Sequence, residues 1–128
     1  MKRETTLRVR YQETDNMGVV YYANYFVWFE VARTEYLRSE SVSYRELEDG
    51  GIYMMVAAAS CQYKHPARYD YEVSVRTWIS AMKNSSLVFN YEILAKDKLL
   101  ATGESTHVFT NRSGRPVRIP EAIRALSR

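Results

Sequence analysis

The first stretch of the chain alternates between apolar and polar residues. Leu7, Val9 and Tyr11 occupy every second position, and arginine or other polar residues fill the positions between them. Because successive side chains of a strand point to opposite faces, this pattern predicts a half-buried β-strand over Thr5–Gln12. The polar run Glu13–Gly18 then predicts a turn, which ends in a glycine that can adopt a positive φ.

From Asn24 to Glu40 the spacing of the apolar residues changes to that of a helix. Large or apolar residues follow one another at spacings of four, three and four: Tyr25, Phe29, Ala32 and Tyr36. An α-helix brings these positions onto one side, so we expect one long helix with a broad apolar face. Asn24 is of a residue type that commonly caps a helix N-terminus.

The rest of the chain predicts a short helix followed by four strands. The short helix covers Ser43–Asp49 and is closed by the glycine pair at 50–51. The apolar run Ile52–Tyr63 lies between this pair and His65-Pro66, and we interpret it as a buried strand. The remaining segments are, in order, a strand over 71–80, a turn over 82–86, a strand over 87–93, a tight hairpin at Asp97-Lys98, a strand over 99–110, a turn over 111–114 and a short helix opened by Pro120.

This order of elements predicts an α+β fold. Strands joined by short turns pair antiparallel, and the long helix has only the resulting sheet against which to bury its apolar face. We therefore expect a five-stranded antiparallel sheet wrapped around one long central helix. A sheet covered by a single helix keeps an open edge and a bare face, so we also expect self-association.

The composition is that of an ordinary globular protein. The 128 residues are 46% hydrophobic and 26% charged, which predicts one domain over residues 1–128 and excludes a disordered chain. No apolar run approaches the roughly 18 residues of a membrane span, and the N-terminus lacks the apolar segment of a secretory signal. The single cysteine, Cys61, cannot form an internal disulfide, so we expect a reducing, cytoplasmic compartment.

The formal net charge of +3 is concentrated near the C-terminus. Residues 96–128 carry 7 basic and 3 acidic side chains, and the arginines among them are Arg112, Arg115, Arg118, Arg124 and Arg128. Such a patch can bind a small anionic ligand or a nucleic acid, or it can simply be solvated. No RNA- or DNA-binding motif accompanies it, so a nucleic-acid-binding domain is the last of the functions that we consider.

Asp15 is the residue whose position points most directly to chemistry. It lies in a glycine-containing loop just before the N-terminus of the long helix, where backbone N–H groups have no intrahelical partner. Such N–H groups can stabilise a carbonyl oxygen that becomes an oxyanion, and a carboxylate beside them suits acyl transfer. Aspartate is also common in turns that it stabilises with its own side chain, and this purely structural interpretation stays open.

Three stretches of the sequence resemble a known family. The run Tyr11–Arg33 resembles the opening signature of the 4-hydroxybenzoyl-CoA thioesterase family, and it is most similar to the acyl-CoA thioesterase branch associated in bacteria with the Tol-Pal system. His65–Asp70 and Lys83–Phe89 match further motifs, so the resemblance covers the chain from residue 7 to about residue 110. It implies the hotdog fold and hydrolysis of an acyl-CoA thioester to a free acid and coenzyme A. No separate cofactor is implied, because coenzyme A is part of the substrate.

The resemblance also implies roles for particular residues. Asp15 matches the catalytic carboxylate, Tyr22 the position whose backbone N–H polarises the thioester carbonyl, and Tyr11 a tyrosine that accompanies the aspartate. A turn that lies along the coenzyme A arm in relatives is matched by Lys83, Asn84, Ser85 and Ser86. The chain departs from the Tol-Pal branch in one respect, since that branch commonly has histidine where this chain has Tyr22.

This chemistry does not require a histidine. The thiolate released from a thioester has a conjugate acid with a pKa near roughly 8.5, so the leaving group needs little protonation. An ionised Asp15 can attack the carbonyl to form an anhydride or can deprotonate a water molecule. The sequence leaves these two routes open.

The resemblance implies further copies of the chain as partners. Hotdog thioesterases of this type are usually dimers paired into tetramers, with each site built across a dimer interface, and acyl-CoA is the implied ligand. A non-catalytic module that binds acyl-CoA or acyl carrier protein is the alternative, although such a module has no need of Asp15. A hotdog dehydratase would need a histidine-dependent pattern that the chain lacks.

The remaining candidate residues are weaker. Cys61, His65 and His107 have a spacing that fits no common metal-ligand pattern. We expect His107 instead to be a core or interface residue with its hydrogen bonds made. The apolar run Met54–Val56 is a candidate lining for the acyl pocket, although such runs are commonly plain core.

Overall fold

The computed structural model describes residues 1–127 of the chain. Its elements are β1 (Arg3–Arg8), a 3₁₀ turn η1 (Tyr11–Glu13), α1 (Asn24–Ser39), α2 (Tyr44–Asp49), β2 (Tyr53–Tyr63), β3 (Glu72–Met82), β4 (Ser86–Ala95), β5 (Lys98–Thr110), α3 (Glu121–Arg124) and η2 (Ala125–Ser127). The predicted order of one strand, a long helix, a short helix and four strands is confirmed. Among the described residues, none of the helices combines the length and the apolar composition of a membrane span.

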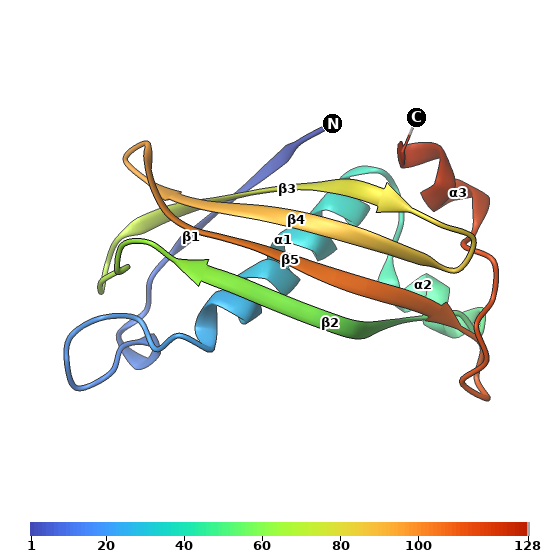
Figure 1. The fold of residues 1–128 in the computed structure, drawn as a ribbon, viewed down its shortest axis with the longest axis horizontal. Helices are drawn as coiled ribbons and strands as arrows, with labels where there is room; N and C mark the ends of the chain where they lie inside the picture. Colours follow the sequence, from blue (N-terminus) through green and yellow to red (C-terminus); the bar gives the residue numbers. More distant parts are fainter. Residues whose placement is uncertain (128) are drawn as a thin grey trace.

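The five strands form one antiparallel sheet in the order β1-β3-β4-β5-β2. Hairpins join β3 to β4 and β4 to β5, so these three strands lie side by side, and β1 and β2 form the two edges. Figure 1 shows α1 lying behind the strands and running obliquely to them. The predicted five-stranded antiparallel sheet packed on one long helix is therefore confirmed.

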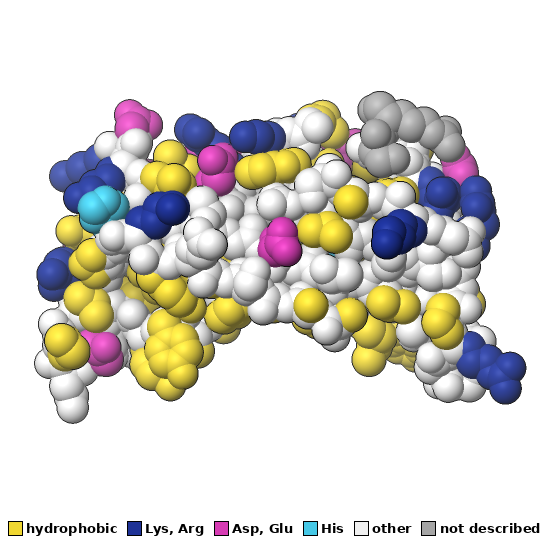
Figure 2. Space-filling model, viewed as in Figure 1, with side chains coloured by type: hydrophobic (Ala, Val, Ile, Leu, Met, Phe, Trp, Pro, Cys, Tyr) yellow, Lys and Arg dark blue, Asp and Glu magenta, His cyan; other side chains and the backbone are white. Residues whose placement is uncertain are grey.

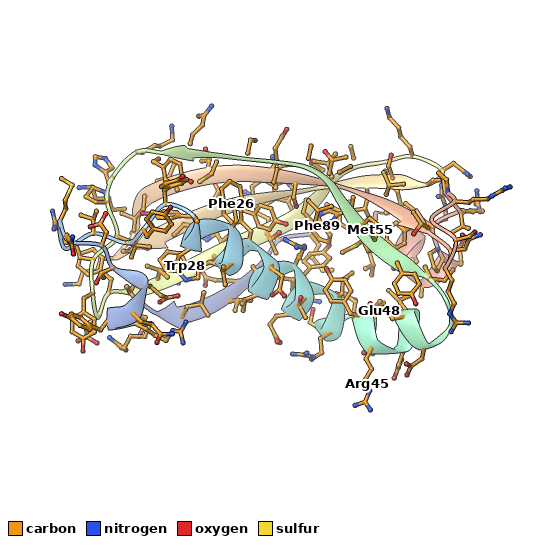
Figure 3. All side chains as sticks on the ribbon, turned by 90° about the horizontal axis from the view of Figure 1, so that it is seen from below. Phe26, Trp28, Arg45, Glu48, Met55 and Phe89 are labelled. Atoms are coloured by element: carbon orange, nitrogen blue, oxygen red, sulfur yellow. The ribbon has the colours of Figure 1, made fainter. Side chains whose placement is uncertain are left out.

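One face of α1 packs against the inner face of the sheet. The four positions that the helical spacing selects are each at most 3% exposed: Tyr25, Phe29, Ala32 and Tyr36. Phe29 stacks on Tyr91 of β4 with ring centroids 4.2 Å apart, and Tyr36 packs edge-on against Phe89. Seen from below, Phe89 lies between the helix and the sheet (Figure 3). This aromatic layer is the centre of the core.

The N-terminal strand ends at Arg8, four residues earlier than the alternating pattern predicts. The prediction of a strand through Gln12 is wrong because Tyr11–Glu13 form a 3₁₀ turn, stabilised by the Arg10 N–H donating to Glu13 Oε1 at 2.7 Å. The predicted cap of the long helix is also wrong. Asn24 is the first helical residue, and its side-chain amide donates to the carbonyl oxygen of Glu13 at 3.0 Å.

β2 is a strand, as predicted, but it is not buried. Every residue from Met55 to Ser60 is exposed, and the exposed fractions of Met55 and Val56 are 53% and 56%. β2 lies at the edge of the sheet, and among residues 1–127 it pairs with β5 on one side and with no strand on the other. Hydrophobic side chains follow the lower margin of the molecule in Figure 2, which is the margin that β2 forms. The prediction of a buried strand is therefore wrong for the single chain.

The turns follow the predicted chemistry with one shift. The β4–β5 hairpin turns at Lys96 and Asp97, one residue earlier than predicted, and both have positive φ, of 49° and 65°. Two positive φ values suit the twist of a two-residue hairpin. The short helix α2 is confirmed, and the hydroxyl of Ser43 caps it by accepting from the Glu46 N–H at 3.4 Å.

Candidate functional site

A short hairpin connects β1 to α1 and carries the predicted catalytic aspartate. The N–H of Asp15 donates to the carbonyl of Val19 at 2.8 Å, and the N–H of Tyr21 donates to the carbonyl of Glu13 at 2.8 Å. A bridge between Val19 and Arg68 joins this hairpin to the segment that follows β2. Figure 1 shows the hairpin projecting beyond the end of the sheet, directly before α1.

The Asp15 side chain forms part of its own turn. Oδ1 accepts from the N–H of Met17 at 2.8 Å and lies 3.4 Å from the N–H of Val19. Gly18 completes the turn with a φ of +80°, a value that a residue with a side chain rarely adopts. This is the structural role that the sequence left open. Oδ2, however, has no hydrogen bond to any of the described residues, so one carboxylate oxygen remains available.

Tyr22 lies at the start of α1 with its N–H unused. The hydrogen bonds of the first helical turn begin with the N–H of Asn24, and within residues 1–127 the N–H groups of Tyr22 and Ala23 donate to no acceptor. In the hairpin Val19 lies opposite Asp15, and Tyr22 follows Val19 by three residues. Among the described residues, a carboxylate oxygen without a hydrogen-bond partner and N–H groups without an acceptor therefore both lie in the segment that joins β1 to α1.

Tyrosines surround this region. The Tyr11 ring contacts Tyr69 edge-on at 5.6 Å, and the Tyr63 ring contacts both Tyr22 and Tyr25. The Tyr63 hydroxyl donates to the carbonyl of Tyr22 at 3.1 Å, which links the end of β2 to the start of α1. Burial, with Cys61 nearby, raises the pKa of Tyr63 to about 12, so this hydroxyl stays a neutral donor.

The turn Lys83–Ser86 lies at the opposite end of the sheet from Asp15. In Figure 1 it lies beside α3, whereas the Asp15 hairpin lies beside the N-terminus of α1. The turn is closed by the Lys83 N–H donating to Ser86 O at 2.7 Å, and Asn84 O accepts from the N–H of Ile119. Within one chain, the structure does not bring these predicted coenzyme A-binding residues to the aspartate.

Two of the C-terminal arginines gather at that turn. Arg118 Nη1 donates to Asn84 Oδ1 at 3.1 Å, and Arg124 Nη1 donates to Lys83 O at 3.1 Å. Arg112 lies elsewhere and donates to Asp49 O at 3.2 Å, while Arg128 lies outside the described residues. The turn is therefore the centre of a basic cluster formed by Lys83, Arg118 and Arg124.

Sequence reasoning missed the importance of Glu13. It is only 6% exposed, and its Oε2 accepts from the indole N–H of Trp28 at 3.0 Å. A signal for this contact exists in the sequence, because a tryptophan on the buried side of a helix needs an acceptor for its N–H. The pattern does not say which residue supplies that acceptor, since Glu13 and Trp28 meet only after the loop folds.

The other titratable candidates lie in the sheet. His107 is fully buried, with Nε2 2.7 Å from Ser105 Oγ and with Nδ1 unpaired among the described residues. Burial raises the pKa of the Cys61 thiol, which is the opposite of what a nucleophilic cysteine needs. Within residues 1–127, no three histidine, cysteine or acidic side chains are grouped as metal ligands.

His107 is expected to make the protein less stable in acid. Burial, with the positive charge of Arg33 as a second cause, lowers the pKa of His107 to about 4, from roughly 6.5 when unfolded. Between these values only the unfolded state takes up the proton, so the free energy of unfolding should fall as pH decreases from 6.5, by about 3 kcal/mol at pH 4. This contribution is measured by urea denaturation of the wild type and of His107→Gln at several pH values from 7 to 4.5. If the free energy of unfolding falls equally with pH in both proteins, the expectation is contradicted.

Comparison with known proteins agrees with this architecture. The model of the thioesterase-like superfamily matches residues 9–126. A putative esterase of Aquifex aeolicus is 33% identical over 91% of this chain and 90% of its own. The acyl-CoA thioester hydrolase YbgC of Escherichia coli O157:H7 is 38% identical over 77% of this chain and 74% of that protein.

Solved structures give the same result. The DHNA-CoA thioesterase from Staphylococcus aureus matches with a TM-score of 0.93 and 32% identity, over 98% of this chain and 91% of that one. The similarity in sequence and the similarity in structure both extend over nearly the whole chain. This chain therefore belongs to the thioesterase-like superfamily and has its hotdog fold.

Proposed function

We propose that this protein hydrolyses acyl-CoA thioesters to a free acid and coenzyme A, with Asp15 as the catalytic carboxylate. The observation that carries the proposal is that Oδ2 of Asp15 and the N–H groups of Tyr22 and Ala23, all in the segment that joins β1 to α1, have no hydrogen-bond partner among the described residues. The names of its relatives in Escherichia coli and Staphylococcus aureus, a thioester hydrolase and a thioesterase, support the same reaction. The lone Cys61 thiol agrees with a cytoplasmic location.

In this mechanism the thioester carbonyl oxygen accepts from the N–H of Tyr22, which stabilises the negative charge as the carbonyl carbon is attacked. Asp15 either attacks that carbon itself, giving an anhydride that water then cleaves, or removes a proton from the attacking water. In both routes the C–S bond breaks and the sulfur leaves as a thiolate, which takes up a proton from solvent. Tyr11, in the turn that precedes Asp15, is the companion tyrosine of the site.

We further propose that β2 pairs with β2 of a second copy. The two edge strands differ in composition: β1 carries Arg3, Glu4 and Arg8, whereas β2 has no charged residue over Tyr53–Tyr63. Charges on an edge strand prevent pairing with another chain, and a long uncharged edge favours it. Burying β2 in this way removes the exposed apolar surface of Met55 and Val56 from water.

Pairing of β2 with its own copy about a two-fold axis also completes the site. An axis normal to the sheet makes the two strands antiparallel, so the Tyr53 end of one lies beside the Tyr63 end of the other. Tyr63 contacts Tyr22 in the site, while the Lys83–Ser86 turn belongs to the end of the sheet that holds Tyr53. The turn of each copy then faces the Asp15 hairpin of the other, where Lys83, Asn84, Ser85 and Ser86 can contact coenzyme A. Two such dimers would form the tetramer.

A glutamate in β2 is expected to separate the dimer. In a dimer of Val56→Glu, each copy contributes a negative charge to the β2–β2 interface, and the two charges repel each other. Because the Val56 side chain is 56% exposed in the single chain, each chain should still fold. Light scattering coupled to size exclusion should give the mass of one chain, against a dimer or tetramer for the wild type. Thr6→Glu is the matched control, since it places the same charge on the other edge strand, β1. An unchanged mass for Val56→Glu would contradict the β2 interface.

Lys83→Ala is expected to weaken substrate binding more than chemistry. If the Lys83 ammonium contacts a phosphate of coenzyme A, its loss removes a charge-assisted hydrogen bond and should raise KM about 10-fold, with kcat changed less than about 2-fold. Lys2→Ala removes the same charge just before β1, where Lys2 Nζ lies 3.4 Å from Glu92 Oε1 of β4, and should leave both constants unchanged. The measurement is steady-state kinetics of the wild type and both variants with one acyl-CoA. An unchanged KM in Lys83→Ala would mean that Lys83 does not bind the nucleotide part of coenzyme A.

The proposed function is tested by measuring thiol release from a panel of acyl-CoAs, from short aliphatic to long and aromatic. We expect release with at least one member, and the panel ranks the acyl preference in the same experiment. If no member is hydrolysed, thioesterase activity is excluded for these substrates. Titration of the same acyl-CoAs by calorimetry then tests the alternative, a non-catalytic module that binds acyl-CoA.

A further inference from the structure

Glu13 is a buried carboxylate in a hairpin whose tip is otherwise exposed. It is 6% exposed, whereas Asp15, Asn16 and Met17 are all open to solvent. Each of its carboxylate oxygens accepts one hydrogen bond, Oε1 from the N–H of Arg10 at 2.7 Å and Oε2 from the Trp28 indole at 3.0 Å. Burying a carboxylate is unfavourable unless such bonds compensate the loss of water, so a chain that needed only a turn would not require this residue.

The main chain of Glu13 is tied to the same helix. Its carbonyl oxygen accepts from the N–H of Tyr21 at 2.8 Å and from the Asn24 side-chain amide at 3.0 Å. Trp28 belongs to the first turns of α1, and Figure 3 shows it on the opposite flank of the helix from Phe26. Side chain and main chain of Glu13 therefore both bind the start of α1, one turn apart.

These contacts connect the two halves of the proposed site. Asp15 follows Glu13 by two residues in one arm of the hairpin, and Tyr22 follows Tyr21, the hydrogen-bond partner of Glu13, in the other arm. A shift of Glu13 relative to Trp28 would therefore move the Asp15 carboxylate relative to the Tyr22 N–H. Misplacement of a catalytic group by about 1 Å can lower a rate by about 10²-fold.

We propose that Glu13 is a positioning residue, which through Trp28 fixes the distance between the Asp15 carboxylate and the Tyr22 N–H. This inference rests on the proposed thioesterase function. Glu13 itself contacts no substrate, because both of its carboxylate oxygens bind the protein. Its contribution should therefore appear in kcat and not in KM.

Glu13→Gln and Trp28→Phe test this role. Glutamine keeps the shape of the side chain but turns an N–H group toward one of the two donors. Phenylalanine removes the indole donor together with part of the volume of a buried ring. We expect kcat to fall 10- to 100-fold in Glu13→Gln and less in Trp28→Phe, with KM within 2-fold of the wild type in both. The double variant should be no slower than Glu13→Gln, because both changes break the same contact.

A matched control separates positioning from general stability. Thr77→Val removes the part-buried hydrogen bond from Thr77 Oγ1 to Asn90 O, 2.8 Å, in the β3–β4 pair, and should lower the melting temperature without lowering kcat. If Thr77→Val loses as much kcat as Glu13→Gln at an equal loss of melting temperature, the inference is overturned.

Two further outcomes are decisive. Wild-type kcat in a folded Glu13→Gln overturns the inference while leaving the proposed function intact, and if Glu13→Gln does not fold, kcat of Trp28→Phe gives the answer in the same way. Absence of hydrolysis by the wild type itself would overturn the proposed function and, with it, this inference.

Discussion

Asp15→Asn is expected to abolish thioester hydrolysis while the protein stays folded. The asparagine Oδ1 can still accept from the Met17 N–H, so the turn that Asp15 forms with its own backbone should remain. The amide nitrogen that replaces Oδ2 can neither attack a carbonyl nor remove a proton from water. Loss of a general base or nucleophile commonly lowers kcat by about 10²- to 10⁴-fold, and we expect at least the lower figure.

The measurement is thiol release by wild type and Asp15→Asn at equal concentration, with calorimetric titration of an acyl-CoA into the variant. Binding should be nearly unchanged, because the lost group acts on the reacting carbonyl. Asp97→Asn is the matched control: it makes the same replacement in an exposed hairpin turn, and should keep full activity. Retained activity in Asp15→Asn would remove this carboxylate from the mechanism and leave it the structural role of an Asx turn.

Gly103→Ala is expected to have the largest effect on stability. A Cβ at this position of β5 would lie 2.5 Å from Cε2 and Cζ of Phe29 and 2.8 Å from the backbone oxygen of Ser60. Phe29 is 1% exposed and stacks on Tyr91, so its ring has no space into which to move. Overpacking a core by one methyl typically costs about 1–3 kcal/mol, and we expect about 3 kcal/mol or more here because both neighbours are fixed.

Urea denaturation of Gly103→Ala checks this expectation. Gly50→Ala is the control, because Gly50 has an ordinary φ of −81° and an added Cβ would meet backbone oxygens only at 3.4 and 3.5 Å. The control should change the free energy of unfolding by less than about 1 kcal/mol. Equal stability of Gly103→Ala and the wild type would mean that α1 can move away from the sheet without loss.

The local patterns predicted the elements well where one physical effect dominated. The spacing of Tyr25, Phe29, Ala32 and Tyr36 predicted α1 to within one residue at its C-terminus, because a helix buries one face. The alternation in β3 and β4 likewise predicted strands with one buried face. The predicted end of the first strand was wrong because a side chain accepts a hydrogen bond from a backbone N–H that a strand partner would otherwise have used. Glu13 holds the Arg10 N–H and turns the chain, although the residues up to Gln12 still alternate.

Site residues that are close along the chain could be placed together from the sequence, whereas the relative position of distant residues could not be predicted. Asp15 and Tyr22 could be placed in one loop from sequence because they are seven residues apart at a helix N-terminus. The position of Lys83–Ser86 relative to them could not be predicted, because it depends on the folded sheet, which places the β3–β4 turn at the opposite end from the Asp15 hairpin. The exposure of β2 could not be predicted from the sequence either, because an apolar strand has the same residue pattern in the middle of a sheet and at its edge.

The sequence by itself determined the elements, their order, the α+β class and a carboxylate in a glycine-containing loop before a helix that buries one face. These follow from periodicity and turn chemistry, which act between residues close along the chain. Only the tertiary structure decided that β2 lies at an edge, that Glu13 meets Trp28, and that Asp15 and Lys83 lie at opposite ends of the sheet. Such facts depend on which strands pair and in what register, and pairing is set by the packing of the whole sheet on α1, so no local pattern can contain them.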